Sequence, residues 1–257
     1  MYKDISMQLY SVRNHMKNID DIRGCFKELR KIGYTGSQVA EKFDTYTYAE
    51  YAQAAKDAGI EIIGTHGNIP EDVDNIDDYV NNHKILGTTN AGIGGFFVKT
   101  VKEYVDMIEK VNRLAENLSK HGMKFTYHHH AHEFGRIDGV RPMDLLVDGF
   151  DKNNVTFVLD TYWLVHAGLD INAWIEKLAG RVDILHLKDR AVCPISGNAS
   201  ITEVGSGNID FAPIIKTAAA TGVKHISEEQ DVWPETRDSL DCAKMSFDYL
   251  NNLLAKL

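Results

Sequence analysis

The sequence of 257 residues predicts a single α/β domain with the (β/α)8 architecture of a TIM barrel, in which eight parallel strands are surrounded by helices. Eight strand-like runs alternate with eight helix-like runs at even spacing along the chain. All five prolines fall in loops or helix starts, where the missing N–H does no harm. No linker divides residues 1–257, so we expect one domain. The main alternative, an open doubly wound sheet, would carry a glycine-rich phosphate turn after its first strand, which is not seen here.

The predicted strands are short runs that end at polar side chains. In chain order they cover residues 4–12, 35–40, 61–67, 88–95, 123–130, 155–163, 182–189 and 224–231. The fourth run, "TTNAGIGG", is the least strand-like because it has few branched residues.

A predicted helix follows each strand. These helices cover residues 20–31, 48–58, 73–86, 98–121, a short segment opened by Pro142, residues 171–178, a segment capped at Asp210 and residues 234–254. The clearest is 98–121, where an apolar stripe at helical spacing is ended by Gly122. The stripe consists of Val101, Val105, Ile108, Val111, Ala115 and Leu118.

Composition and charge exclude several classes of protein. Lys and Arg number 28 against 37 Asp and Glu, a net charge of −9, which argues against a nucleic-acid partner. Cys25, Cys193 and Cys242 are far apart and odd in number, so neither a disulfide framework nor a thiolate zinc site is predicted. The start has no signal-peptide pattern, and no run is apolar enough to cross a membrane. We therefore expect a cytoplasmic protein without a membrane partner, although a removed export signal would leave no trace.

A run of histidines ends the fifth predicted strand, in the stretch "YHHHAHEF" at residues 127–134. In a barrel of this kind, chemistry takes place at the C-terminal ends of the strands. The next three strands also end in groups that can bind a metal. The candidates on strands five to eight are His128, His129, His130, His132 and Glu133, then Asp160, then His186 with Lys188 and Asp189, then Glu228, Glu229, Gln230 and Asp231. Earlier strands offer Gln8, Arg13, Gln38, His66 and Asn68.

Carboxylates and imidazoles from neighbouring strand ends predict one divalent ion, which could be Mn²⁺, Mg²⁺, Co²⁺ or Zn²⁺. Because side chains alternate along a strand, we expect His128 and His130 to face the barrel interior and His129 to be a buried hydrogen-bonding residue. Asp160 could instead cap a helix, and His186 could be a core histidine. The position of all these groups at adjacent strand ends favours the metal site.

These residues resemble the sugar phosphate isomerase/epimerase superfamily, which has xylose-isomerase-like barrels and relatives of endonuclease IV. The resemblance covers nearly the whole chain. It rests on "MQLYSVR" (residues 7–13), "YHHHAHEF", "LDTYW" (159–163), "HLKD" (186–189), "VGSGNIDF" (204–211) and "EQD" (229–231). The resemblance implies a metal held by Glu133, Asp160, His186 and Glu229. The first position aligns ambiguously, so His128 or His130 could replace Glu133, and His129 stands where such sequences usually have Asn.

The resulting hypothesis is a divalent-metal-dependent isomerase or epimerase that acts on a sugar, keto-sugar or sugar phosphate through a metal-stabilised enediolate. The alternative is a metal-dependent lyase or dehydratase on a keto-sugar, keto-glycoside or inositol derivative. For proton transfer and charge stabilisation we select His128, His130, Glu133, Lys188 and Glu229, and for substrate binding Gln8, His66, Trp163 and Lys188.

Two other classes are less consistent with the sequence. A phosphodiesterase acting on DNA would need more metal ligands and a basic rim, and a non-catalytic sugar-binding barrel would have no use for a metal set. The loop "GSGN" at residues 205–208 could cradle a phosphate, but it lacks a P-loop lysine and reads as a plain loop. The expected partner is a small carbohydrate, and relatives of this kind suggest a homodimer.

Overall fold

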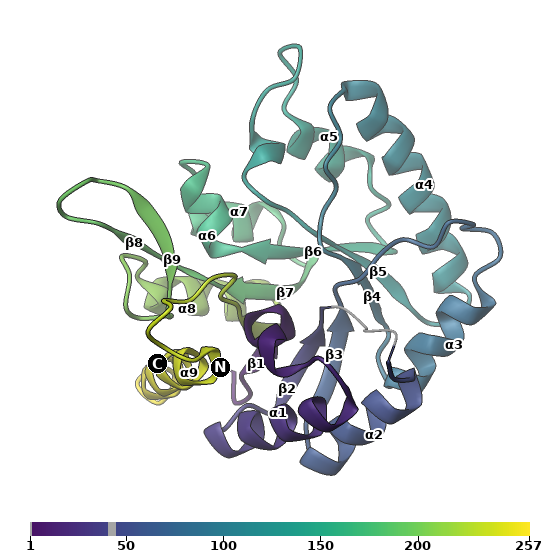
Figure 1. Cartoon of the computed structure of the whole chain (residues 1–257). Coiled ribbons are helices and arrows are strands. Elements are labelled where there is room, and N and C mark those ends of the chain that lie inside the picture. Colours follow the sequence, from purple (N-terminus) through teal and green to yellow (C-terminus); the bar gives the residue numbers. More distant parts are fainter. Residues whose placement is uncertain (1, 41–44) are drawn as a thin grey trace.

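The computed structural model describes residues 2–40 and 45–257 and contains the predicted barrel (Figure 1). Eight parallel strands form one sheet in the order β3-β2-β1-β10-β7-β6-β5-β4. A parallel bridge between Gly67 and Ile93 links the β3 side to β4, so the barrel is nearly closed. The strands are β1 (Ser6–Gln8), β2 (Gly36–Val39), β3 (Glu61–Thr65), β4 (Asn90–Ile93), β5 (Lys124–His128), β6 (Val155–Asp160), β7 (Val182–Leu187) and β10 (His225–Glu228).

The strands are buried on both faces, as expected of a parallel barrel covered by helices. Every residue of β6 and of β7 is buried, including Asp160 and His186 at or near their ends. Such polar residues need partners or ligands, because burial without them is costly. The polar strand ends are therefore the part of the barrel where function is expected.

Helices surround the sheet (Figure 1). They are α1 (Ile19–Ile32), α2 (Tyr48–Ala58), α3 (Asp77–Leu86), α4 (Val101–Ser119), α5 (Pro142–Gly149), α6 (Thr161–His166), α7 (Ile171–Lys177), α8 (Phe211–Thr221) and α9 (Ser239–Leu254). Capping boxes fix the starts of α2 and α4, where Thr47 pairs with Glu50 and Thr100 pairs with Glu103. The helix predicted from residue 98 thus begins three residues later, because Thr100 is its N-cap.

Several elements differ from the prediction. Strand β6 ends at Asp160 and α6 begins at Thr161, within the strand predicted to residue 163, and α3 and α9 begin at Asp77 and Ser239, after the predicted starts at residues 73 and 234. The first strand ends at Gln8, whose Oε1 accepts the N–H of Tyr10 and starts a 3-10 helix, η1 (Leu9–His15), where a strand to residue 12 was predicted. Beyond β7, an antiparallel hairpin of β8 (Asp189–Val192) and β9 (Ala199–Thr202) replaces the predicted loop. Figure 1 shows this hairpin extending away from the barrel.

The "GSGN" segment is a loop pinned by Asp189. The buried carboxylate of Asp189 accepts N–H bonds from Gly205 and Gly207, each at 2.9 Å, and from Ile209 at 3.2 Å. A Cβ at residue 207 would overlap this carboxylate, so glycine is required there. The amides that could have cradled a phosphate thus bind a carboxylate of the protein itself.

Candidate functional site

Four buried side chains converge at the C-terminal end of the barrel: His128, Asp160, His186 and Glu229. One ligand atom from each lies within 4.8 Å of those of the others. They come from β5, β6, β7 and the residue after β10, which are consecutive in the sheet. Asp160 is directly opposite His186 in the register of β6 and β7. We call these four residues the metal group, because imidazoles and carboxylates at this spacing can hold a divalent ion.

The orientation of His186 is set by Gln38 on β2. Nε2 of His186 donates to Oε1 of Gln38 at 2.6 Å, so Nδ1 carries the free lone pair of the neutral ring. Nδ1 is buried, has no hydrogen-bond partner among the described residues, and lies 2.9 Å from Oε2 of Glu229. Two acceptors at this distance need a cation or a proton between them. A divalent metal therefore fits the donor set.

Lys188 places a positive charge beside the metal group. Its Nζ lies 3.1 Å from Asp160, 2.8 Å from Glu229 and 2.9 Å from Asp231, and its side chain is buried. Burial alone would lower the pKa of Lys188, but the three carboxylates outweigh burial and raise the pKa above its ordinary value. Lys188 consequently stays charged at neutral pH.

The histidines at the end of β5 differ in environment. Nδ1 of His128 donates to the Gly94 carbonyl at 3.2 Å, Nε2 lies 3.4 Å from Oδ2 of Asp160, and burial lowers the pKa of His128 well below the usual value. His129 faces the other way, as expected, and its Nε2 accepts the N–H of Asp160 at 3.1 Å. Burial lowers the pKa of His130 to about 4, and its Nδ1 has no hydrogen-bond partner among the described residues. His130 is thus a neutral imidazole with a nitrogen available for proton transfer.

Glu133 lies outside the metal group, which corrects the ligand implied by the resemblance. It sits in the 3-10 turn η2 (His132–Phe134), and its carboxylate accepts from Tyr127 Oη at 2.9 Å and from the His130 N–H at 2.8 Å. Tyr127 alternates with His128 on β5 and so faces the helices, which turns Glu133 away from the ion position. His128 takes the strand-five place that was left open. Glu133 instead forms a second, smaller group with His130 and His132.

The buried carboxyl of Glu133 should make stability depend on pH. Burial raises its pKa from 4.5 to about 7, against hydrogen bonds that lower it. The folded state therefore binds more protons than the unfolded state between these values. The free energy of unfolding should fall as pH rises through this window, by up to about 3 kcal/mol. Glu133→Gln should remove this dependence, which chemical denaturation of both proteins at several pH values would measure; parallel pH profiles would contradict it.

A cavity of about 500 Å³ opens in front of the metal group. Six of the residues selected from the sequence for catalysis or substrate binding line it, namely Gln8, His66, His128, His130, Lys188 and Glu229. Nε2 of Gln8 and Nδ1 of His66 are buried and unpaired among the described residues, so both can bind substrate hydroxyls. Trp163 is not among the described lining residues. Its ring lies beside the site, 5.1 Å from the His130 ring and 5.3 Å from Nζ of Lys188, and substrate binding by Trp163 stays a prediction.

The sequence placed Gln38 and Asp231 among the polar strand ends but assigned neither of them a role in the site. Gln38 orients His186, and Asp231 is the third carboxylate around Lys188. Burial and the neighbouring Glu229 raise the pKa of Asp231 to about 6. The available signals in the sequence were Gln38, a polar residue inside the buried strand "GSQV", and Asp231, the last residue of "EQD". Glu228, the neighbour of Glu229, is buried on the opposite face, where burial raises its pKa to about 8.

Residues 26–244 match the sequence pattern of the family described as the xylose isomerase-like TIM barrel. The chain belongs to this family. Among curated proteins, an inosose dehydratase of Clostridium perfringens (strain 13) is 30% identical over 148 residues, which are 52% of this chain and 49% of that protein. The chain thus spans about half the length of the curated relatives it matches.

Solved structures of the family share the fold. A sugar phosphate isomerase/epimerase from Parabacteroides distasonis superposes with a TM-score of 0.82 at 23% identity, covering 97% of this chain and 94% of that one. The IolI protein, crystallised with a bound zinc atom, superposes with a TM-score of 0.73 at 16% identity and covers 98% of each chain. At these identities, the likeness establishes the barrel architecture of this xylose isomerase-like protein.

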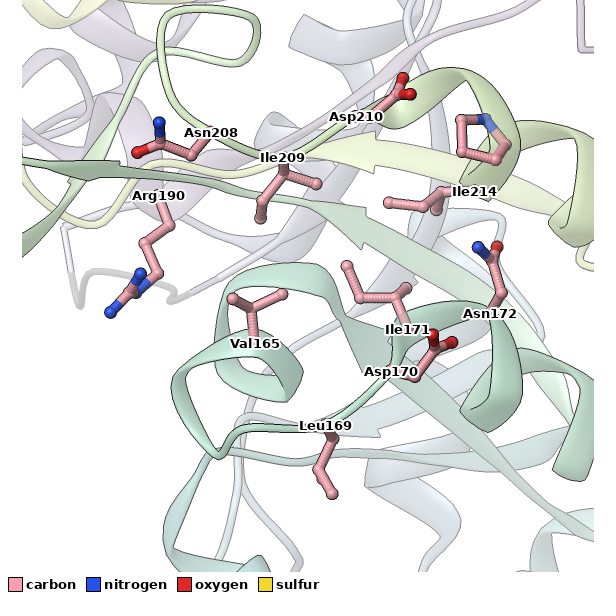
Figure 2. Close-up of a pocket in the computed structure, with 11 residues that line it drawn as sticks. Val165, Leu169, Asp170, Ile171, Asn172, Arg190, Asn208, Ile209, Asp210 and Ile214 are labelled. Carbon is pink, nitrogen blue, oxygen red and sulfur yellow. The ribbon is translucent and has the colours of Figure 1, made fainter.

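A separate cavity of about 340 Å³ lies in the outer layer, between the loop joining α6 to α7 and the start of α8 (Figure 2). Figure 2 shows Ile171, Ile209 and Ile214 around it. Asp170 and Asp210 at its edge are the N-caps of α7 and α8. No member of the metal group lines it among the described residues. It is a gap in helix packing apart from the site.

In the part of the chain that the structure describes, no helix is long and apolar enough to cross a membrane.

Proposed function

We propose that this chain is a divalent-metal-dependent lyase that removes water from a keto-sugar or keto-cyclitol. The reaction would begin with loss of the proton next to the carbonyl, the same first step as in an isomerase or epimerase. The observation that carries the proposal is the buried contact between Nδ1 of His186 and Oε2 of Glu229, beside Asp160 and His128; of these residues, Glu229 and His128 also line the cavity. The dehydratase activity named for the curated relatives supports elimination as the outcome.

The metal would be held by His128, Asp160, His186 and Glu229, and it would supply Lewis-acid polarisation of the substrate carbonyl. The remaining steps would be carried out by side chains of the protein. His130 is neutral and its buried Nδ1 has no hydrogen-bond partner among the described residues, so it takes the proton from the carbon next to the carbonyl. The ammonium of Lys188 stabilises the negative charge that develops on oxygen. His130 then returns its proton to the departing hydroxyl, which leaves as water.

Epimerisation is the second candidate, and His66 is the observation that favours it. His66 lines the same cavity as His130, and its own Nδ1 is also unpaired among the described residues. Burial lowers the pKa of His66 well below its usual value, so its ring is neutral. If His66 delivered a proton to the opposite face of the carbon, the product would be an epimer and no water would be lost.

The test is to incubate the protein in deuterated water with a panel of ketoses, keto-glycosides and inososes, with added Mn²⁺, Mg²⁺, Co²⁺ or Zn²⁺ or with a chelator. Mass spectrometry and NMR would follow both deuterium at the carbon next to the carbonyl and loss of water. Chelator-sensitive loss of water is the expected result. Exchange or isomerisation without loss of water would select the epimerase or isomerase. The absence of both from every carbonyl compound would refute the proposal.

A further inference from the structure

The segment after β4, residues 94–97 with the sequence "GGFF", lies against the histidines of the site. We call this segment the strap. Gly94, Gly95 and Phe97 line the cavity in front of the metal group. The strap approaches four histidine side chains, namely His66 after β3 and His128, His130 and His132 at or after the end of β5. It therefore touches the groups that the proposed chemistry uses, although it carries no side chain suited to acid–base work.

Two carbonyls of the strap orient two of these imidazoles. The Gly94 carbonyl accepts from Nδ1 of His128 at 3.2 Å, and the Phe96 carbonyl accepts from Nε2 of His132 at 2.7 Å. Because a carbonyl only accepts, the bonded nitrogen of each ring must carry the hydrogen. In the neutral form of His128, Nε2 is consequently the nitrogen left to face Asp160. The backbone of the strap thus selects which nitrogen each ring presents.

The two glycines of the strap let its backbone lie directly against two further rings. A Cβ on Gly94 would lie 2.9 Å from Cδ2 and 3.0 Å from Nε2 of His66. A Cβ on Gly95 would lie 2.8 Å from Nδ1 and 2.9 Å from Cε1 of His130. Gly95 also has a φ of +129°, which residues with a Cβ rarely adopt. A side chain at either position would therefore push one particular imidazole away from its place.

Packing holds the His66 and His130 rings at the cavity, since Nδ1 of each is buried without a hydrogen-bond partner among the described residues. The centre of the His130 ring lies 5.4 Å from that of Phe97 and 5.1 Å from that of Trp163. Gly95 meets the edge of the same ring. Because Phe97 and Gly95 both belong to the strap, the strap limits the movement of His130 at two places.

We propose that Gly94 and Gly95 are positioning residues, through which the strap sets how far the imidazoles of His66 and His130 reach toward the substrate. Gly95 fixes the distance from His130 to the carbon that loses its proton. Gly94 fixes the distance from His66 to a substrate hydroxyl. This inference rests on the proposed function, since that function assigns the proton transfer to His130. It makes the loop after β4 a determinant of the reaction, although the reacting groups lie on other strands.

The first arm of the test follows the imidazoles without turnover. NMR would record the Cε1–H signals of isotope-labelled histidine in the substrate-free protein, with His66→Gln and His130→Gln to assign the two signals. Gly94→Ala should shift the His66 signal more than the His130 signal, and Gly95→Ala should do the reverse. Any other pattern, including equal shifts of both signals or no shift, would overturn the proposal.

Two glycines away from the cavity provide the controls. A Cβ on Gly24 or on Gly122 would meet no atom within 4 Å, and Gly122 has a φ of +71°, so it tests backbone strain alone. Gly24→Ala and Gly122→Ala should both keep the wild-type signals of His66 and His130. Circular dichroism would establish folding. Gly94 has no positive φ, so if Gly95→Ala did not fold, the two signals in Gly94→Ala would decide the question.

The second arm separates kcat from KM on a ketose or inosose that the wild type turns over. Gly95→Ala should lower kcat by about 100-fold with little change in KM, because a displacement of about 1 Å in a reacting group has an effect of this size. Gly94→Ala should raise KM by about tenfold with a smaller effect on kcat, as expected for one weakened hydrogen bond. An equal loss of kcat in both variants at unchanged KM would show a general structural role and would overturn the proposal.

Failure of this inference and failure of the proposed function give different results. If the reaction is wrong, no keto compound is turned over, but the two variants still shift different histidine signals. If the positioning role is wrong, the signals do not shift selectively, whereas chelator-sensitive turnover by the wild type persists.

Discussion

Asp160→Asn should abolish retention of the divalent metal and, with it, turnover. Asp160 is buried at the end of β6, where Oδ2 lies 3.4 Å from His128 and 3.9 Å from His186, and it contributes one of the negative charges of the metal group. The amide keeps the shape of the side chain but loses the charge. Loss of a residue that only supports a ligand weakens metal binding by about 10–100-fold, so loss of a ligand should exceed this range.

The matched control is Asp183→Asn. Asp183 is also a buried aspartate on a barrel strand, but it pairs with Lys224 at 3.0 Å away from the metal group. Elemental analysis after dialysis should find wild-type metal content in Asp183→Asn and little or none in Asp160→Asn. If the metal content of Asp160→Asn equalled that of the wild type, Asp160 would be removed from the ligand set. Its role would then be limited to the N-cap of α6, where Oδ1 accepts the Trp163 N–H.

The architecture of the barrel could be read from the sequence because it depends on local patterns. The eight strand runs and the polar residues at their ends are visible in one dimension, and a parallel barrel brings those ends together. The sequence therefore predicted that Asp160, His186 and Glu229 lie together, because the strands that carry them are neighbours in the sheet. The alternation of side chains also placed His128 and His129 on opposite faces.

What the sequence could not fix lies beyond the regular strands. Glu133 follows β5 by a turn, and the direction of its carboxylate depends on a hydrogen bond to Tyr127 that strand alternation does not predict. Gln38 contacts His186 across the barrel, 148 residues away in the chain. The sequence did not predict the hairpin after β7, because its strands are mostly only partly buried and do not alternate between a buried and an exposed face. Trp163 lies in α6, beyond the end of β6, so strand alternation does not predict the direction of its ring.

Lys188→Met should destabilise the metal-free protein strongly and have a much smaller effect once metal is bound. In the wild type, Nζ lies within 3.1 Å of three carboxylates, those of Asp160, Glu229 and Asp231. Removing one partner from a buried ion pair costs about 3–5 kcal/mol, because charges remain buried without compensation. A divalent ion in the metal group would supply the missing positive charge. The difference between chelator-treated and metal-loaded protein in thermal unfolding should therefore be larger in Lys188→Met than in the wild type.

The control is Lys102→Met, which removes the same side chain from an exposed position. Lys102 pairs with one exposed carboxylate, Asp106, and a pair of this kind contributes little to stability. The loss of stability in this control variant should be small and independent of metal. Equal destabilisation of Lys188→Met with and without metal would show that Lys188 acts through packing rather than through charge.

The pH dependence of the Lys188→Met protein separates these two roles further. Without the ammonium, burial and mutual repulsion should raise the pKa of Glu229, which Lys188 holds well below its usual value in the wild type. A carboxyl with a raised pKa in the folded state takes up a proton as pH falls, so the chelator-treated variant should gain stability relative to the wild type at acidic pH. If Lys188→Met caused only a packing defect, the difference in stability between the variant and the wild type would not change with pH. In the proposed reaction, the ammonium that lowers the pKa of Glu229 would also stabilise the negative charge on the substrate oxygen, so both proposed roles of Lys188 would have one electrostatic origin.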